Sequence, residues 1–105
     1  MDLSGIQQLA LKNLKDRSVV EIPSAGCIIG RDGNLNPSYF TDFKYVSRHH
    51  AKIYYFRGKY FIQDLNSTNG TKVNGLKIEN YMGTPIKGGD RISLADIDFE
   101  VIYLW

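Results

Sequence analysis

The sequence predicts an all-β domain, either a sandwich or a barrel, preceded by one short helix. From Ser18 onward, short runs of β-branched and aromatic residues are separated by Gly, Asn, Asp and Pro at intervals of about 8 to 12 residues, which is typical of both architectures. The chain has 105 residues, which fits a single domain with one hydrophobic core. We expect this domain at residues 18–105, with residues 1–17 as an N-terminal helical extension.

The N-terminal segment carries the strongest helical pattern of the chain. Ser4 and Gln7 have the spacing of a capping box, which begins a helix. Apolar residues then recur at helical spacing. These residues are Leu3, Ile6, Leu9, Ala10 and Leu14. The pattern predicts a helix over about residues 4–16.

The β-rich part contains segments whose length and composition indicate strands. They lie at residues 19–22, 26–29, 51–56, 59–63, 91–94 and 97–103. Arg57-Gly58 separates two of them by a tight turn, which predicts a hairpin. Asn74-Gly75 predicts a second hairpin, because both residues accept the positive φ angles of a type I′ turn.

Two segments do not fit a simple strand pattern. Residues 32–46 contain Pro37 and several turn-forming residues, but also Tyr39, Phe40 and Phe43. We expect a long, partly packed loop with a short strand, and core packing for at least two of these aromatic side chains. Residues 80–90 are rich in Gly and contain Pro85, which indicates a loop that links two sheets.

Composition excludes several classes of protein. Hydrophobic residues make up 43% of the chain and charged residues 23%, as in an ordinary folded domain. The net charge of +2 is too small for the broad positive field of a dedicated nucleic-acid binder. The single cysteine, Cys27, lies in an apolar run and is expected to be a buried thiol.

The sequence also bears on membranes and cellular location. No stretch approaches the roughly 20 apolar residues that span a bilayer, and no secretory signal begins the chain. We expect a cytoplasmic location, or a nuclear one in a eukaryote, no membrane partner, and a place within a larger polypeptide or complex.

Catalysis and metal binding are not expected. His49 and His50 are neighbours, and neighbours in an extended strand point to opposite faces, so they are poorly placed to share one metal ion. Ser47 could pair with either histidine, but the sequence identifies no acid to orient the pair. Common hydrolase, phosphate-loop and zinc-protease motifs are absent from the sequence. We therefore predict neither an enzyme nor a bound cofactor or metal.

Three polar and basic clusters stand where predicted strands begin or end. Because a sandwich gathers its loops at its two ends, such clusters can converge on one exposed site. The clusters are Gly30-Arg31, Ser47-Arg48-His49-His50 and Asn66-Ser67-Thr68-Asn69-Gly70-Thr71. Taken singly, each is also typical of an ordinary turn.

Together the clusters offer guanidinium groups, hydroxyls and an amide. A phosphate group presents three acceptor oxygens and carries about −1.5 to −2 charge at neutral pH, so it suits this set of donors. Charge-assisted hydrogen bonds contribute roughly 1.5 to 3 kcal/mol each, so a few of them can separate a phosphorylated from an unphosphorylated ligand. The joint occurrence of the clusters therefore favours phosphate recognition.

The order and spacing of these residues resemble the forkhead-associated (FHA) domain. The resemblance covers about residues 18–105. The matching segments are Gly30-Arg31, Ser47-Arg48-His49-His50, Asp64-Leu65-Asn66-Ser67-Thr68-Asn69-Gly70-Thr71, Asn74-Gly75 and Gly88-Gly89-Asp90-Arg91-Ile92. It implies an FHA/SMAD-like, two-sheet antiparallel β-sandwich that binds phosphothreonine in partner proteins or peptides during signalling.

The resemblance also implies roles for individual residues. Arg31, Ser47 and Thr68 match the family's phosphate ligands, Arg48 matches an assisting position, and Asn69 matches the residue that bonds the peptide main chain. The implied structural supports of the site are Gly30, His50 and Gly70. Family members usually begin with a strand earlier than residues 19–22, so either that strand is missing here or the predicted helix covers the sheet edge in its place.

Two other functions remain open at this point. An FHA scaffold could bind a partner or oligomerise without phosphorylation, through a sheet face or the N-terminal helix. Nucleic-acid binding ranks third and is not expected, since strand alternation divides the basic and aromatic side chains between two faces. These side chains belong to Lys44, Tyr45, Arg48, Lys52, Tyr54, Tyr55, Phe56, Arg57 and Lys59.

Overall fold

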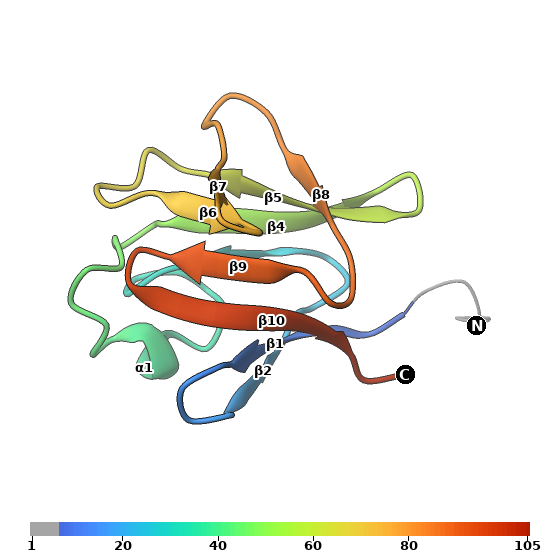
Figure 1. The fold of residues 1–105 in the computed structure, drawn as a ribbon, viewed down its shortest axis with the longest axis horizontal. Helices are drawn as coiled ribbons and strands as arrows, with labels where there is room; N and C mark the ends of the chain where they lie inside the picture. Colours follow the sequence, from blue (N-terminus) through green and yellow to red (C-terminus); the bar gives the residue numbers. More distant parts are fainter. Residues whose placement is uncertain (1–6) are drawn as a thin grey trace.

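Residues 7–105 are described by the structure, a computed structural model, and they form two antiparallel sheets packed face to face (Figure 1). The predicted all-β sandwich is therefore confirmed. The elements, in chain order, are β1 (Leu9–Asn13), β2 (Val19–Glu21), β3 (Cys27–Ile29), α1 (Pro37–Phe40), β4 (Ala51–Phe56), β5 (Lys59–Asp64), β6 (Thr71–Val73), β7 (Leu76–Lys77), β8 (Thr84–Ile86), β9 (Arg91–Leu94) and β10 (Ile97–Tyr103).

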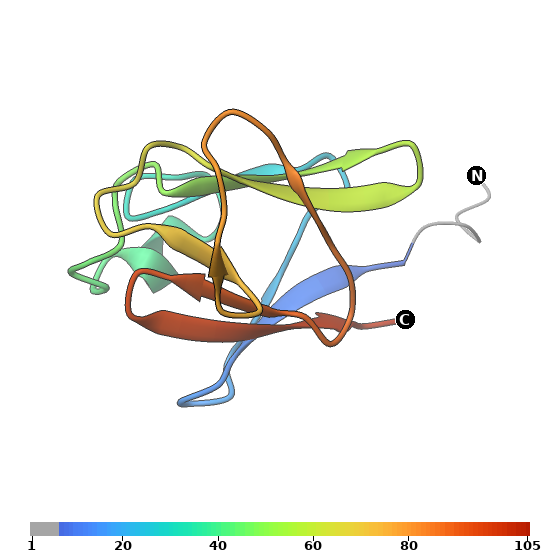
Figure 2. The same ribbon diagram turned by 45° about the horizontal axis from the view of Figure 1, so that its top comes forward.

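The two sheets differ in size and lie one over the other (Figure 2). The larger, which we call sheet A, has the strand order β2-β1-β10-β9-β6-β7, and the smaller, sheet B, has the order β3-β4-β5-β8. Alternate residues of each strand point between the sheets, so that Ile53 of β4 and Ile62 of β5 share the core with Phe99 of β10.

The N-terminal helix predicted over residues 4–16 is wrong where the structure describes it, and residues 1–6 lie outside the described part. Leu9–Asn13 is strand β1, which pairs with β10 from Leu9↔Tyr103 to Asn13↔Phe99 and with β2 on its other side. Leu9 and Leu11 are fully buried on one face. Isolated helices of about 12 residues are marginal in water, so pairing between two strands of a sheet overrides the local pattern. β1 is the early strand of the family pattern, which the sequence analysis expected to be either missing or replaced by the helix.

The segment 32–46 contains one helical turn, α1, where the sequence analysis expected a short strand. Phe40 of this turn is fully buried, and Tyr39 and Phe43 pack against the core in edge-to-face contacts with it, with ring centroids 5.0 and 5.8 Å away. The prediction that the segment is partly packed is confirmed. Pro37 begins the turn, as its fixed φ angle favours.

The segment 80–90 does link the two sheets, but it also contains strand β8. β8 pairs with β5, with Phe61 opposite Pro85, and forms the edge of sheet B. Proline cannot donate a backbone hydrogen bond, so an edge strand is where it is tolerated.

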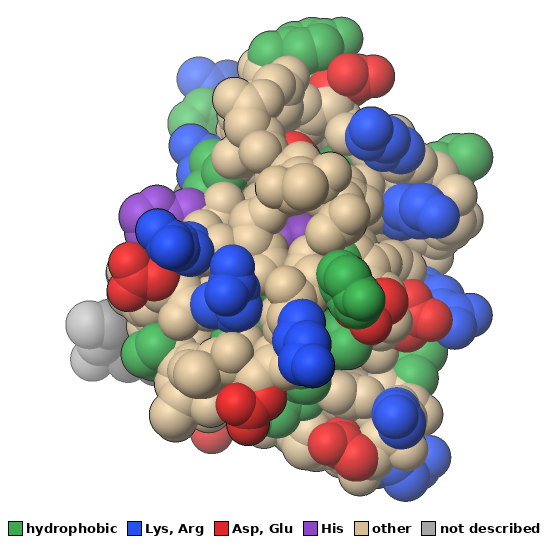
Figure 3. All heavy atoms as spheres, turned by 90° about the vertical axis from the view of Figure 1, so that its left-hand side faces the viewer, with side chains coloured by type: hydrophobic (Ala, Val, Ile, Leu, Met, Phe, Trp, Pro, Cys, Tyr) green, Lys and Arg blue, Asp and Glu red, His purple; other side chains and the backbone are tan. Residues whose placement is uncertain are grey.

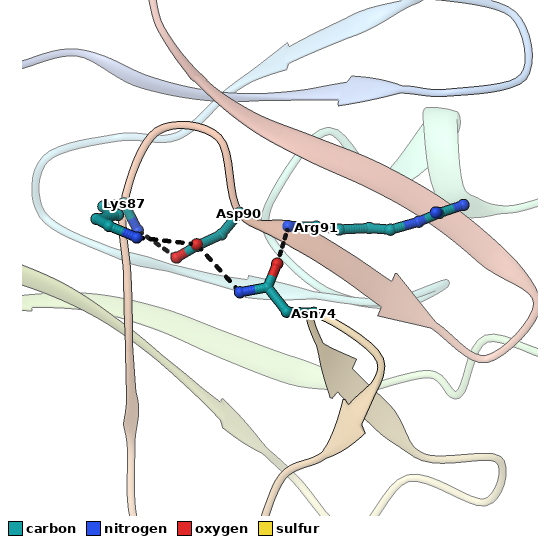
Figure 4. A network of polar contacts seen from close by, with 4 residues as sticks. All are labelled: Asn74, Lys87, Asp90 and Arg91. Atoms are coloured by element: carbon teal, nitrogen blue, oxygen red, sulfur yellow. Dashed lines mark hydrogen bonds and ion pairs between the residues drawn. The ribbon is translucent and has the colours of Figure 1, made fainter.

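The β8–β9 connection is fastened to the β6–β7 hairpin by Asp90 (Figure 4). The Asp90 carboxylate accepts hydrogen bonds from Asn74 Nδ2 at 3.1 Å and from the Lys87 backbone amide at 2.9 Å, and pairs with Lys87 Nζ at 3.2 Å. Asn74 Oδ1 in turn accepts a bond from the Arg91 amide at 2.9 Å. Asn74 and Gly75 adopt positive φ angles of 52° and 84°, as the predicted turn requires.

Candidate functional site

The three polar clusters lie at one end of the sandwich. Residues 30–31 follow β3, residues 47–50 precede β4, and residues 65–70 join β5 to β6, all on the left-hand side of Figure 1. Viewed from that side, Lys and Arg side chains spread over the surface, with histidine and some carboxylate side chains among them (Figure 3). Sheet pairing thus brings together three segments that are distributed over residues 30–70 of the sequence.

Gly30 allows the first two clusters to touch. The amide of Arg31 donates to Ser47 O at 3.2 Å, and the amide of Asp32 donates to Arg48 O at 2.9 Å. A Cβ atom on residue 30 would lie 2.0 Å from Arg48 O, so no larger residue fits without moving the backbone. This close approach explains the glycine before the arginine.

His50 holds the second and third clusters together from behind. Its side chain is fully buried, Nδ1 accepts a hydrogen bond from the Ser47 amide at 2.9 Å, and Nε2 lies 2.8 Å from Gly70 O. Nε2 must therefore carry the proton and donate to Gly70 O. Burial lowers the pKa of His50, against smaller opposing effects of the Gly70 carbonyl and the Asp64 charge, which favours the neutral ring.

Asp64 organises the third cluster, a role that the sequence analysis did not assign. This buried carboxylate accepts hydrogen bonds from the Ser67 amide at 3.0 Å, the Ser67 hydroxyl at 2.5 Å and the Thr71 hydroxyl at 2.7 Å. Ser67 Oγ then accepts a bond from the Gly70 amide at 3.0 Å, and Gly70 has a φ angle of 86°. An Asp followed by Ser three positions later is the sequence signal for such a turn.

Ser47, Thr68 and Arg31 keep hydrogen-bond donors for a ligand. Ser47 Oγ accepts the Thr68 amide at 3.0 Å, which leaves the hydroxyl proton of Ser47 to point elsewhere. Arg31 uses Nε to bond Val46 O at 2.6 Å, which fixes the side chain while its terminal nitrogens remain available. Thr68 and Arg31 are exposed.

Asn69 and Arg48 lie on the same rim. Asn69 donates Nδ2 to Tyr45 O at 2.9 Å, so its exposed side chain joins the 65–70 loop to the segment just before Ser47. Arg48 is exposed, and its carbonyl is held by the Asp32 amide. Tyr45, which is 60% exposed, is the aromatic side chain that the loop offers to solvent here.

The two arginines of this end are not paired with a carboxylate among the described residues, although the exposed Asp32 follows Arg31 in the chain. Within residues 7–105 the ion pairs are Lys12–Glu100, Lys87–Asp90 and Arg91–Asp98, and none involves Arg31 or Arg48. Asp64 is turned toward Ser67 and Thr71 rather than toward either arginine.

The two histidines occupy different environments, as the sequence analysis expected. His49 is exposed, and its Nε2 lies 3.0 Å from Asp32 O, whereas His50 is buried. Over residues 7–105, no group of three or more His, Cys, Asp or Glu side chains is placed to hold a metal ion.

The family model of the FHA domain matches residues 27–95 of this chain. The chain belongs to the FHA domain family. In this FHA domain β1 and β10 lie outside the matched residues, and both are full members of sheet A.

Individual proteins resemble this FHA domain along most of its length. Protein FraH of Nostoc sp. is 32% identical over 102 residues, which is 89% of this chain and 35% of that protein, so the chain spans about a third of this relative. An FHA domain solved in a study of phosphothreonine-dependent FHA domain interactions is 26% identical, with a TM-score of 0.76 over 90% of this chain and 95% of that one.

Mycobacterium tuberculosis EmbR, solved in complex with a low-affinity phosphopeptide, is also similar. It is 29% identical, with a TM-score of 0.79 over 91% of this chain and 24% of that one. Among residues 7–105 of our FHA domain, no helix is long and apolar enough to cross a membrane.

Proposed function

We propose that this FHA domain is a binding module, without catalytic chemistry, that recognises phosphothreonine in partner proteins. The phosphate would lie between Arg31, Ser47 and Thr68, with Arg48 adding positive charge and Asn69 bonding the peptide main chain. Signalling through phosphorylation-dependent contacts between proteins is the role that follows. Two structural relatives were solved in phosphopeptide or phosphothreonine contexts, which supports this proposal.

The observation that carries the proposal is a set of fixed donors in which neither Arg31 nor Arg48 forms an ion pair with a carboxylate of the described residues. Arg31 is held through Nε and Ser47 through its acceptor oxygen, so the remaining donors point from a preorganised frame. Ordering flexible side chains opposes binding, and here much of that order exists before the ligand arrives. Gly30, His50 and Gly70 supply the frame rather than contacts to the phosphate.

The test is a screen of degenerate phosphothreonine peptides, followed by titration of the best peptide by fluorescence anisotropy. Losing one charge-assisted contact of roughly 1.5 to 3 kcal/mol corresponds to about a 10- to 100-fold weaker Kd, so Arg31→Ala should weaken binding by that factor. Arg31→Lys should recover only part of the affinity, because an ammonium group lacks the planar fork.

Lys15→Ala removes one exposed cation in the β1–β2 turn, outside the three clusters, and serves as the matched control. It should leave the Kd unchanged. Equal binding of the phosphorylated and unphosphorylated peptides, or equal loss in Lys15→Ala and Arg31→Ala, would contradict the proposed site.

A further inference from the structure

The outer face of sheet B differs in charge from the outer face of sheet A. In sheet A, Lys12 Nζ lies 3.8 Å from Glu100 and Arg91 Nη2 lies 2.9 Å from Asp98, while the exposed Lys72 and Lys77 form no ion pair among the described residues. In the four strands of sheet B the only carboxylate is Asp64, which is buried. The outer face of sheet B therefore carries positive charge without internal neutralisation.

The strand registers show which side chains share that face. Lys52 lies opposite Ile28 and Gln63, Tyr54 lies opposite Phe61, and Phe56 lies opposite Lys59. Phe61 in turn lies opposite Pro85 of β8. We call these outward residues the sheet B patch: Ile28, Lys52, Tyr54, Phe56, Lys59, Phe61, Gln63 and Pro85, with Arg57 in the adjoining turn.

The patch combines a central aromatic row with cations on both sides of it. Tyr54 and Phe61 stack with ring centroids 5.3 Å apart, Lys52 Nζ lies 5.5 Å from the Tyr54 centroid, and the Arg57 guanidinium lies 5.2 Å from the Phe56 centroid. Phe56 is 54% exposed, and Lys59 and Arg57 are exposed. Large apolar side chains rimmed by charge on a surface are typical of interaction sites.

The aromatic rings favour a protein ligand over a nucleic acid. A base needs a free ring face on which to stack. Phe61 already covers one face of Tyr54, and Lys52 and Arg57 approach the rings of Tyr54 and Phe56. The cations beside these rings suit carboxylates, and the exposed Phe56 suits an apolar side chain.

We propose that the sheet B patch is a second binding surface, for an acidic protein segment that carries apolar side chains. Carboxylates of the segment would pair with Lys52 and Lys59, and an apolar side chain would pack on the exposed Phe56. The proposal does not depend on phosphothreonine binding, because the patch lies on a sheet face and the proposed phosphate residues lie in loops at one end. It gives the phosphorylation-independent scaffold function a defined surface.

The experiment maps binding of a synthetic 12-residue peptide of alternating Glu and Phe residues by ¹⁵N HSQC titration at low salt. We expect chemical-shift changes at residues 52–56 and 59–63, and at least a tenfold loss of affinity in the double variant Lys52→Glu/Lys59→Glu. Circular dichroism of each variant checks that the fold is retained. The same peptide with Gln in place of Glu should bind at least tenfold more weakly.

The matched control is Lys15→Glu/Lys72→Glu, which makes the same change in net charge at two exposed lysines outside the patch. It should retain the affinity, as should Arg31→Ala. Equal weakening in both double variants, shifts confined to the 47–50 and 65–70 loops, absence of binding, or tighter binding of oligothymidylate than of the peptide would each overturn the proposal.

Discussion

Removing the Asp64 carboxylate tests whether this group holds the 65–70 loop in place. In Asp64→Ala the Ser67 hydroxyl and the Ser67 amide each lose their acceptor, and the fully buried Thr71 hydroxyl is left without its bond. Bonds to a charged group contribute about 1.5 to 3 kcal/mol each, and an unsatisfied buried group costs about 1 to 3 kcal/mol. Because two of the three bonds come from one residue, their contributions are not independent.

We therefore expect Asp64→Ala to lower the free energy of unfolding by about 3 to 5 kcal/mol, as for other broken buried charge networks. Small domains have a total of only about 5 to 15 kcal/mol, so the effect is large. Urea denaturation followed by far-UV circular dichroism measures it. With a slope of about 1 to 2 kcal/mol per molar urea, the midpoint should fall by about 1.5 M or more.

Two comparisons decide the interpretation of this measurement. Asp64→Asn keeps one acceptor oxygen, so its free energy of unfolding should lie between those of the wild type and Asp64→Ala. The exposed Asp42→Ala should change stability by about 0.5 kcal/mol or less. If Asp64→Ala and Asp42→Ala unfold at the same urea concentration, the carboxylate does not organise the loop and the argument from its three bonds is wrong.

Three further predictions concern other parts of the fold. Phe40→Ala should cost about 3 to 5 kcal/mol in urea denaturation, whereas Tyr45→Ala at a 60% exposed ring should cost far less; similar losses would contradict the assignment of Phe40 to the core. Gly30→Ala should weaken phosphopeptide binding in the anisotropy assay, because its Cβ would displace Arg48 O; unchanged binding would refute this. Burial raises the pKa of Asp90, but bonds from Asn74 and Lys87 outweigh it and the net pKa is lowered. The Asp90 carboxylate therefore stabilises the fold fully above its unfolded pKa of about 3.9, and this stabilisation is lost as pH falls through the lower folded pKa. The difference in free energy of unfolding between the wild type and Asp90→Asn should narrow below about pH 4. A difference that does not change with pH would show that these bonds do not matter.

Much of the sandwich was predictable because its strands have short-range signals. The strand composition of residues 97–103, the Arg57-Gly58 turn and the Asn74-Gly75 turn each predict local geometry, and all three are found. Segment 9–13 failed because its spacing of Leu9, Ala10 and Leu14 fits a helix, while the buried face that decides the outcome is supplied by β10, about 90 positions later in the chain. Local patterns contain no information about such a distant partner.

The candidate site was predictable as a set of residues and not as a network. Each cluster can be recognised by its residue types, and the resemblance to FHA domains relates them to one another. The bonds that join the clusters, from His50 to Ser47 and Gly70 and from Asn69 to Tyr45, depend on sheet packing and cannot be derived from spacing alone.

Cys27 shows the same limit outside the site. Its burial matches the sequence expectation, whereas the rise of its thiol pKa to about 12 through desolvation could be found only from the structure.

The pairing of β1 with β10 has a mechanical consequence. Leu9 at the start of β1 lies opposite Tyr103 at the end of β10, and the Leu104 amide donates to Gln8 O at 2.8 Å. A pulling force applied through residues 8 and 104 therefore acts across this ladder at one end, so that the backbone bonds break one after another rather than all together. Under tension this sandwich should unzip from the side remote from the 47–50 and 65–70 loops, and those loops would be the last part to feel the load.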